Sequence, residues 1–360
     1  MATQHLPDRN LVLVAGTMIL LGIVILASVS ASFSLERTGN TFYFLQHQIL
    51  FGLLPGLILG AIAYAFPLEK LKRLSLVFLT GNLVLLLFVF LPFFGAEVRG
   101  SYRWIYLGPF SFQPSELLKI TFILYLAAWM SSKKERILLP FIFILGIISL
   151  FLIMQPDIST LGIIGLTGIF MYFVAGTPLL HALFIVTGGL GILALLALVA
   201  PYRASRIAVF FDPTLDPLGK GYQLKQALIG IGSGGLTGVG LGLSVQKFGV
   251  LPEPISDSIF AIFAEETGFI GVIILLLMFL LFAWQGSKVA NNARDTFSKL
   301  AAMGIVSWIT LQALLNIASM TGLLPIAGIP LPFISYGGSA LVTELIGLGI
   351  LLNISRRTSL

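Results

Sequence analysis

Residues 258–284 read SIFAIFAEETGFIGVIILLLMFLLFAW, and this stretch decides the fold class. After Glu265 and Glu266 it carries no charged residue as far as Trp284. A helix needs about 20 mostly apolar residues to cross the hydrocarbon core of a bilayer. The stretch therefore predicts a membrane-spanning helix.

Comparable apolar runs recur along the chain. Of its 360 residues, 57% are hydrophobic and only 10% are charged, whereas soluble domains carry about 25% charged residues. So few charges cannot cover the surface of a soluble domain, and disordered chains are far more polar. We predict an all-α polytopic membrane protein that forms a single domain over residues 1–360. Its ten predicted transmembrane helices cover residues 11–32, 44–66, 74–94, 114–131, 137–154, 158–175, 179–200, 258–284, 300–322 and 335–354.

The distribution of Lys and Arg predicts the orientation of these spans. Of 21 such residues, 12 fall in the termini and short loops of one side, whereas the short loops opposite hold three. Cytoplasmic loops of membrane proteins carry this excess of positive charge. We therefore expect both termini in the cytoplasm and residues 201–257 as one large extracytoplasmic loop.

Residue types exclude several kinds of site. The chain has no Cys, which excludes disulfides, thiolate metal sites and thiol nucleophiles. Its three His are scattered, so a zinc site built from His is not expected. The Gly-rich stretches 231–235 and 238–242 lack the Lys-Ser/Thr pair of a P-loop, which argues against a nucleotide site. These glycines form either a flexible outer loop or a set of backbone amides that binds an anion.

Asp257 lies where the large outer loop ends and the apolar helix begins. One interpretation is a helix N-cap, a position that Asp occupies well. The other is a general base at the boundary between water and lipid. Positions 261, 264, 265 and 268 follow on the same helical face and hold Ala, Ala, Glu and Gly. Because most of these side chains are small, this helix face predicts either close helix packing or a cavity.

A second charged pair lies near the start of the predicted span 114–131. Glu116 and Lys119 are three residues apart, so they share a helix face. They form either a structural ion pair or the cationic wall of an anion site, because ionisable residues within spans are commonly functional. In the loop before them, Trp104 suits the level of the lipid headgroups.

The last outer loop, residues 322–339, reads GLLPIAGIPLPFISYGGS. Its three Pro and four Gly prevent a continuous helix, yet the segment is too apolar for a solvated loop. Irregular backbone at membrane depth is tolerated where it is buried in protein or lines a cavity. We therefore expect a re-entrant segment.

Seven short motifs, in their order along the chain, resemble the SEDS family of bacterial cell-wall proteins, which includes FtsW and RodA. They are Arg103-Trp-Ile105, Gln113-Pro-Ser-Glu-Leu-Leu-Lys119, Gln155-Pro-Asp157, Gly221-Tyr-Gln223, Ile231-Gly-Ser-Gly-Gly235, Leu251-Pro-Glu253 and Leu331-Pro-Phe-Ile-Ser-Tyr-Gly-Gly-Ser339. The resemblance covers nearly the whole chain and all ten predicted spans. It is closer to FtsW than to RodA in the stretches 221–226 and 240–249.

One position departs from the family pattern. The family usually has Thr-Asp-Phe-Ile-Phe around its catalytic aspartate, and this chain has Ser256-Asp-Ser-Ile-Phe260. The aspartate is kept and Ser supplies the hydroxyl of the usual Thr. The loss of the Phe at Ser258 changes the local packing. Glu344, in the last span, is also unusual for the family.

The resemblance implies a glycosyltransferase that polymerises peptidoglycan strands from lipid II at the outer face of the bacterial cytoplasmic membrane. The 4-hydroxyl of the acceptor sugar attacks the anomeric carbon of the donor, and polyprenyl diphosphate leaves. Asp257 is the implied general base. The residues expected to contact the substrate are Arg103, Trp104, Lys119, Arg203, Arg206, Lys247, Glu265 and Ser335. A divalent cation, Mg or Mn, is an optional cofactor, and its expected ligands are Asp257 and Asp157.

The implied partners are the nascent glycan strand, a class B penicillin-binding protein transpeptidase and other division proteins, and no nucleic acid is expected. A division role is favoured over a RodA-type elongation role. Two other readings remain. A lipid II flippase would need a polar path through the bilayer, for which Lys119, Glu265, Glu266 and Glu344 are the plausible residues. A scaffold for a partner enzyme would leave Asp257 unexplained.

Overall fold

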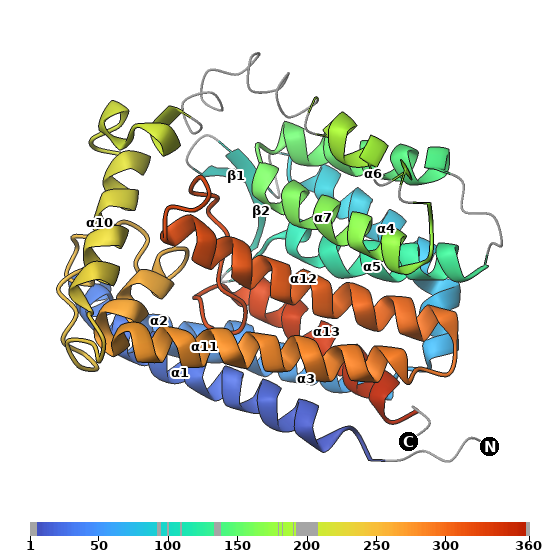
Figure 1. Ribbon diagram of the computed structural model, residues 1–360, viewed down its shortest axis with the longest axis horizontal. Coiled ribbons are helices and arrows are strands. Elements are labelled where there is room, and N and C mark those ends of the chain that lie inside the picture. The colour runs from blue at the N-terminus through green and yellow to red at the C-terminus, as the bar shows by residue number, and fades with distance from the viewer. Residues whose placement is uncertain are drawn as a thin grey trace.

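The computed structural model describes residues 6–91, 95–98, 101–108, 110–132, 138–178, 180–181, 183–189, 191 and 208–357. Long helices run side by side as a bundle, and α10 (Lys220–Ser233) lies across one end of it (Figure 1). Both chain termini lie at the other end. The two ends of the chain are in contact there, because the backbone N–H of Asp8 donates to Ser355 Oγ over 3.1 Å.

Within the described residues, six helices are long and apolar enough to cross a membrane. They are α1 (Arg9–Thr38), the continuous helix Tyr43–Ala65, α4 (Leu68–Phe88), α11 (Ile259–Asn291), α12 (Thr296–Met320) and α13 (Gly338–Ser355). Three further predicted spans are occupied by α5 (Pro114–Ser132), α6 (Leu138–Met154) and α7 (Ile158–Val174). The predicted span 179–200 lies mostly outside the described residues, so the count of ten stays a prediction.

The second span contains a π-helical segment. The helix α2 (Tyr43–Gln48) continues through the π-helix η1 (Ile49–Leu53) into α3 (Leu54–Ala65). Pro55 is the second residue of α3, and a Pro in a helix removes one backbone hydrogen bond and crowds the preceding turn. A local change of helix type is the usual accommodation. Gln48 lies at this junction and reaches the last outer loop, as described below.

The outer loops hold more regular structure than the sequence analysis predicted. The strands β1 (Gly95–Val98), β2 (Ser101–Leu107) and β3 (Phe110–Phe112) form an antiparallel sheet in the order β1-β2-β3. Aromatic and β-branched residues favour strands, and β2 is rich in aromatic residues. In the large loop, the short 3-10 helix η2 (Pro213–Leu215) precedes α10. This sheet adds a small β element to the predicted all-α fold.

The centre of the bundle is α12, which packs against α5, α7, α11 and α13. Its Trp308 is fully buried. Glycine allows a close approach between α3 and α13. A Cβ added to Gly349 would lie only 2.1 Å from the carbonyl oxygen of Gly60, so these two helices meet backbone to backbone, as small residues allow in membranes.

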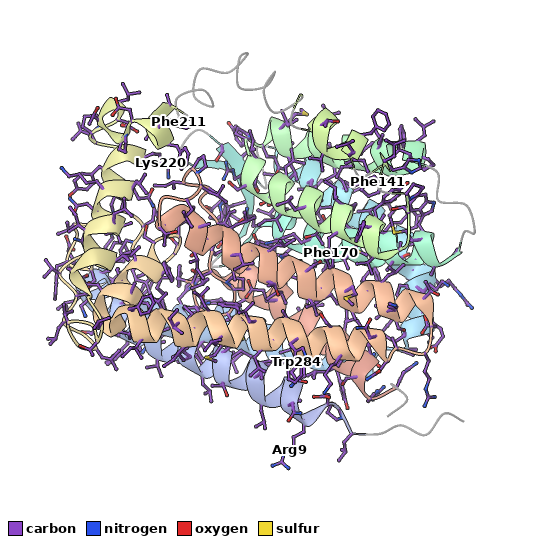
Figure 2. All side chains as sticks on the ribbon, viewed as in Figure 1. Arg9, Phe141, Phe170, Phe211, Lys220 and Trp284 are labelled. Carbon is purple, nitrogen blue, oxygen red and sulfur yellow. The ribbon has the colours of Figure 1, made fainter. Side chains whose placement is uncertain are left out.

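The outside of the bundle is apolar. Figure 2 labels Trp284 of α11 and Phe170 of α7, whose side chains are 58% and 40% exposed. Other exposed apolar side chains of α11 are Phe269, Ile270, Ile273, Ile274, Leu277, Leu280 and Leu281. Such a surface is stable against lipid and not against water, which agrees with the membrane fold.

Candidate active site

Asp257 lies in a run of turns, residues 251–258, that leads into α11. The N-cap of α11 is Ser258, so Asp257 lies one residue outside the helix and does not occupy the cap position. The buried Ser258 hydroxyl donates to the Pro252 carbonyl over 2.8 Å and accepts from Gln223 Nε2 of α10 over 2.9 Å. Ser258 therefore fastens this segment to α10.

Three consecutive carbonyl groups fix the backbone at Asp257. The carbonyls of residues 255, 256 and 257 each accept a hydrogen bond from α12 or from the last outer loop. The donors are the Tyr336 N–H to Ile255 (2.8 Å), Ser335 Oγ to Ser256 (2.6 Å) and Asn316 Nδ2 to Asp257 (2.9 Å). The segment that carries Asp257 is therefore held in place through its main chain.

The Asp257 carboxylate faces the last outer loop. A Cβ added to Gly328 would lie 3.2 Å from Asp257 Oδ2, so the loop backbone passes directly beside the carboxylate. Gly328 also has a φ of +67°, a conformation that glycine adopts without strain. The Asp257 side chain is only partly buried. Glycine at position 328 thus serves two purposes. It adopts the left-handed backbone conformation without strain, and it leaves room for the Asp257 carboxylate.

The last outer loop, predicted at residues 322–339, covers residues 321–337 between α12 and α13 in the structure. It is irregular and carries buried apolar residues, as predicted for a re-entrant segment. The Ser335 hydroxyl accepts from the Leu331 N–H over 2.8 Å and donates to the Ser256 carbonyl. These two hydrogen bonds link the last outer loop to the segment that carries Asp257. On the other side of the loop, Gln48 Oε1 accepts from the Gly337 N–H over 3.0 Å, and the Tyr336 hydroxyl bonds His47 Nδ1 over 2.9 Å. The loop therefore connects α2 to the Asp257 segment.

Glu344 of α13 has a structural contact in the same loop. Its Oε2 accepts from the Phe333 N–H over 2.8 Å. Phe333 has a φ of +63°, which is costly for a residue with a side chain. The buried carboxylate of α13 therefore holds a strained residue of the loop in place.

Asp157 and Arg103 lie together at the start of α7. Asp157 is the N-cap of α7, and it accepts from the Thr160 N–H over 3.4 Å and from Ser115 Oγ over 3.0 Å. Arg103 Nε of β2 donates to the Gln155 carbonyl over 3.0 Å. Its terminal nitrogen donates to the next carbonyl, at position 156. Asp157 therefore has a structural role as a helix cap.

Asp157 and Asp257 flank the same loop without forming a metal cage. Next to Asp157, the Ser159 hydroxyl donates to the Ala327 carbonyl, and Ala327 precedes the Gly328 that faces Asp257. In the described part of the chain, no group of three His, Asp or Glu side chains converges on one point. Magnesium commonly binds one or two carboxylates together with substrate phosphates. Asp157 serves as the cap of α7, and the role of Asp257 as a ligand of such a shared ion stays a prediction.

Lys119 is buried inside the bundle with its charge paired. Its Nζ lies 2.8 Å from Glu116 Oε2 and donates to Gln312 Oε1 over 2.8 Å. It also lies 5.3 Å from the centre of the Trp308 ring, in cation–π geometry. The geometry therefore supports the structural ion pair over an open cationic wall.

Lys247 and Glu265 are also engaged within the protein. Lys247 Nζ lies 3.0 Å from Glu266 Oε1 and donates to the Gly242 carbonyl over 2.6 Å. Glu266 Oε2 accepts from Ser28 Oγ of α1 over 3.0 Å. Glu265 accepts from the Ser244 hydroxyl and from the N–H groups of residues 245 and 246. Both carboxylates of α11 thus organise the chain between α10 and Asp257.

The small-residue face of α11 serves close packing. A Cβ added to Gly234 would lie 2.3 Å from the Ala264 carbonyl oxygen, and one added to Gly238 would lie 2.1 Å from that of Glu266. The Gly-rich stretch also bonds α11 through its backbone, since the N–H groups of Val239 and Gly240 donate to the carbonyls of residues 265 and 266. The glycines therefore fit against α11, which is the close-packing outcome of the sequence analysis.

The remaining residues predicted to contact the substrate are Trp104, Arg203 and Arg206. Trp104 lies half-buried on β2, opposite Ala96 of β1. Arg203 and Arg206 lie outside the described residues. The structure brings Asp257 and Ser335 together and places Lys119, Lys247 and Glu265 in internal contacts.

Two site residues of α12 were missed by the sequence analysis. Gln312 and Asn316 are one helical turn apart and donate to the carbonyls of Pro330 and Ile329 over 3.0 Å and 2.6 Å. Both are fully buried. The available signal was two amides spaced four residues apart within an apolar span, because polar residues there seek partners inside the protein.

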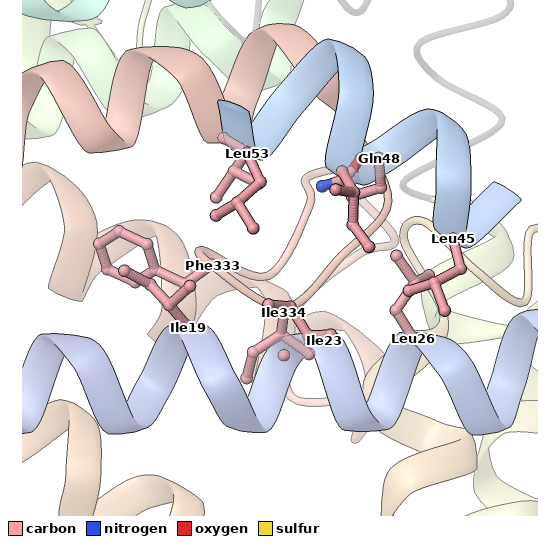
Figure 3. A pocket seen from close by; sticks show the side chains of 11 residues that line it. Ile19, Ile23, Leu26, Leu45, Gln48, Leu53, Phe333 and Ile334 are labelled. Atoms are coloured by element: carbon pink, nitrogen blue, oxygen red, sulfur yellow. The ribbon is translucent and has the colours of Figure 1, made fainter. Parts of the chain in front are cut away.

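A separate cavity lies behind the last loop, between α1 and the η1 region (Figure 3). Its lining is apolar apart from Gln48, and it includes Phe333 and Ile334 of the loop. Without a charged lining residue, this cavity offers no group for proton transfer or for binding a diphosphate.

Comparison with known proteins gives the family. Residues 8–360 match the FtsW/RodA/SpoVE family, described as "Cell cycle protein". This chain belongs to that family. It is 41% identical to Stage V sporulation protein E of Bacillus subtilis (strain 168), over 97% of each chain. It is 39% identical to the probable peptidoglycan glycosyltransferase FtsW of Thioalkalivibrio sp. (strain K90mix), over 98% of this chain and 90% of that one.

Solved structures share the fold. One, described as "Structural coordination of polymerization and crosslinking by a peptidoglycan synthase complex", matches with a TM-score of 0.79 and 27% identity over 97% of this chain and 98% of that chain. The rod shape determining protein RodA of Thermus thermophilus matches with a TM-score of 0.72 and 25% identity, over 97% of each chain. These matches support the architecture and place the chain among integral membrane proteins.

Proposed function

We propose that this chain polymerises glycan strands of peptidoglycan from lipid II, with Asp257 as the general base. By its family, the chain is a membrane-embedded peptidoglycan glycosyltransferase. The observation that carries the proposal is the arrangement at Asp257, whose main chain is fixed by three hydrogen bonds while its carboxylate lies partly exposed beside Gly328. A catalytic base needs this combination of fixed position and access.

The reaction assigns a role to this carboxylate. The acceptor 4-hydroxyl forms a bond to the donor anomeric carbon, while the bond from that carbon to the diphosphate oxygen breaks. Asp257 takes the hydroxyl proton as the new bond forms, and the polyprenyl diphosphate leaves with its electron pair. General base catalysis of this type contributes about 10²–10⁴-fold in rate.

The departing diphosphate needs positive charge. We propose Arg103 for this role, because its two described hydrogen bonds go to neutral carbonyl groups and do not neutralise it. Lys119 and Lys247 are each paired with a buried carboxylate, which reduces their value as anion ligands. Where a divalent cation binds, Asp257 would hold it, and the ion would neutralise the diphosphate.

We also propose that the chain acts in cell division with a crosslinking partner, a class B penicillin-binding protein. Its curated relatives carry the names FtsW and Stage V sporulation protein E. A structural neighbour is described as a complex that coordinates polymerization and crosslinking. Both termini would lie in the cytoplasm, with Asp257 at the opposite, outer end of the bundle.

The test is polymerisation by the purified chain. Lipid II is incubated with the full chain and a class B penicillin-binding protein, and the products are separated on a gel. We expect a ladder of glycan polymers that depends on this chain. Transfer of fluorescent lipid II across vesicle membranes without any polymer would replace the proposal with the flippase alternative.

A further inference from the structure

Asn316 of α12 connects two parts of the candidate site. Its Nδ2 donates to the carbonyl of Asp257 over 2.9 Å and to the carbonyl of Ile329 over 2.6 Å. Ile329 directly follows Gly328, whose backbone lies beside the Asp257 carboxylate. One amide nitrogen therefore ties the segment that carries Asp257 to the loop that covers it.

The orientation of this amide is determined by its surroundings. Both neighbours of the Nδ2 atom are carbonyl oxygens, which only accept, so the NH₂ group must face them. The side chain is fully buried, and Oδ1 has no hydrogen-bond partner among the described residues. An unpaired buried acceptor destabilises a fold. The site thus keeps an Asn whose side chain has only the two carbonyl groups as described polar contacts.

The neighbouring turn of α12 supports the same loop. Gln312 donates to the Pro330 carbonyl over 3.0 Å, while its Oε1 accepts from Trp308 Nε1 over 2.9 Å and from Lys119. The buried ion pair of Lys119 therefore fixes Gln312, and Gln312 fixes the loop next to the contact made by Asn316. Two successive amides of a rigid helix set the position of this loop.

We infer that Asn316 is a positioning residue that sets the distance between the Asp257 carboxylate and the loop at Gly328. The inference rests on the proposed function of Asp257 as the base. A displacement of about 1 Å at a reacting group can lower the rate about 10²-fold. Loss of the Asn316 donor frees the Asp257 carbonyl while the carbonyls of residues 255 and 256 stay bonded, so the segment shifts without unfolding.

The chain offers a matched control in α13. Asn353 is also fully buried, and its Nδ2 also donates to two carbonyl groups, those of Ala63 (3.1 Å) and Phe66 (2.6 Å). Its Oδ1 likewise has no described partner. Asn353 lies near the end of α13 where the termini meet, at the other end of the bundle from Asp257. The same substitution at both positions therefore removes equivalent bonds at different distances from the site.

The experiment compares Asn316→Leu with Asn353→Leu in the full chain, purified with the class B penicillin-binding protein and supplied with lipid II. Thermal unfolding is followed alongside kcat and KM per folded molecule. We expect similar losses of Tm in both variants, a fall in kcat of at least tenfold for Asn316→Leu with little change in KM, and kcat within twofold of the wild type for Asn353→Leu. Asn316→Ala and Asn353→Ala, which remove the donor without adding bulk, are compared in the same way if the Leu variants do not fold.

Two outcomes would overturn the inference. The first is an Asn316 variant that keeps the wild-type kcat, and the second is an equal loss of kcat in both Leu variants. Failure of the proposed function looks different, because the wild-type chain itself then makes no polymer. A shift in the pH profile of kcat for the Asn316 variant alone would further support a change at the base, since a purely structural effect would leave the profile in place.

Discussion

Asp257 takes its position from the main chain around it. The neighbouring Ser258 occupies the N-cap of α11, and the carbonyl of Asp257 is bonded to Asn316. A side-chain substitution of similar size therefore leaves these main-chain contacts intact while it changes the chemistry of the carboxylate. This separation allows the two interpretations of Asp257, helix cap and general base, to be tested against each other.

Asp257→Asn is expected to abolish detectable glycan polymer, because an amide cannot take the acceptor proton, and the loss of a general base lowers the rate by about 10²–10⁴-fold. Asp257→Ala should have the same effect on activity. Both variants should unfold within a few degrees of the wild type. Polymer gels and thermal unfolding measure these effects. An active Asn variant beside an inactive and less stable Ala variant would instead identify a structural residue.

Gly328→Ala is expected to lower polymerisation more than an equivalent change elsewhere. The new Cβ would lie 3.2 Å from Asp257 Oδ2 and displace the carboxylate or the loop. Gly39→Ala is the control, because Gly39 has a similar φ of +71° but no atom within 4 Å of the added Cβ. Both variants carry the cost of a left-handed conformation, about 1–2 kcal/mol. Equal activity per folded molecule in the two variants would contradict the close approach at Gly328.

The sequence was informative about Asp257 and less so about the cations. A carboxylate between an outer loop and an apolar helix was visible as a candidate base from its position alone. The partner of Lys247 is not visible in the sequence, because Glu266 lies 19 residues away and pairs with Lys247 only where the chain folds back on α11. Whether the charge of a lysine is neutralised depends on contacts between segments that are distant in the sequence. The expected role of Lys247 in binding substrate therefore stays a prediction.

At the scale of elements, α11 is interrupted where the Gly-rich stretch meets it. Gly268 has φ +65° and ψ −167° within the helix, and Gly238 approaches it closely. The N–H groups of residues 269 and 270 donate to the carbonyls of Gly235 and Leu236 over 2.9 Å and 3.1 Å. Backbone groups freed by the break are thus paired with the Gly-rich stretch, as a low-dielectric environment requires.

Lys247→Met is expected to destabilise this junction strongly. The substitution leaves the buried Glu266 carboxylate without its cationic partner, and breaking a buried pair on one side costs about 3–5 kcal/mol. Thermal unfolding in detergent should show a large fall in Tm. A Tm unchanged from the wild type would mean that the pair contributes little to this junction.

The double variant Lys247→Met with Glu266→Gln separates structure from substrate binding. Removing both charges avoids the unpaired carboxylate, so we expect the Tm to recover largely. If the pair is purely structural, polymerisation recovers together with the Tm. Recovery of the Tm without recovery of polymer would instead support the predicted role of Lys247 in holding the diphosphate.

The long helices could be predicted from the sequence, and the small outer elements could not. The bilayer thickness sets the length of an apolar run such as residues 258–284, so a spanning helix can be recognised from composition alone. The three-residue strand β3 depends instead on pairing with β2, in a register that begins at Ile105 opposite Phe112. α10 has few apolar residues in sequence and obtains its position from contacts such as Gln223 with Ser258.

At the scale of the whole molecule, the contact between Asp8 and Ser355 constrains the topology. The start of the first span and the end of the last lie on the same side, which requires an even number of crossings. Arg357 also pairs with Glu69 at the start of α4 over 3.0 Å. The pair brings the basic first turns of α4, which carry Lys70, Lys72 and Arg73, to the same end of the bundle as Arg357. Their concentration there predicts a cytoplasmic location.

The orientation can be tested with single cysteines, because the chain contains no native Cys. Leu218, which is 92% exposed next to α10, represents the end with Asp257, and the exposed Lys288 near the end of α11 represents the other. In spheroplasts, a membrane-impermeant maleimide should label Leu218→Cys directly and Lys288→Cys only after permeabilisation, while detergent should expose both. The reverse pattern would place Asp257 in the cytoplasm. A base on that side could not act on substrate at the outer face, so the same measurement tests the topology and the assigned site together.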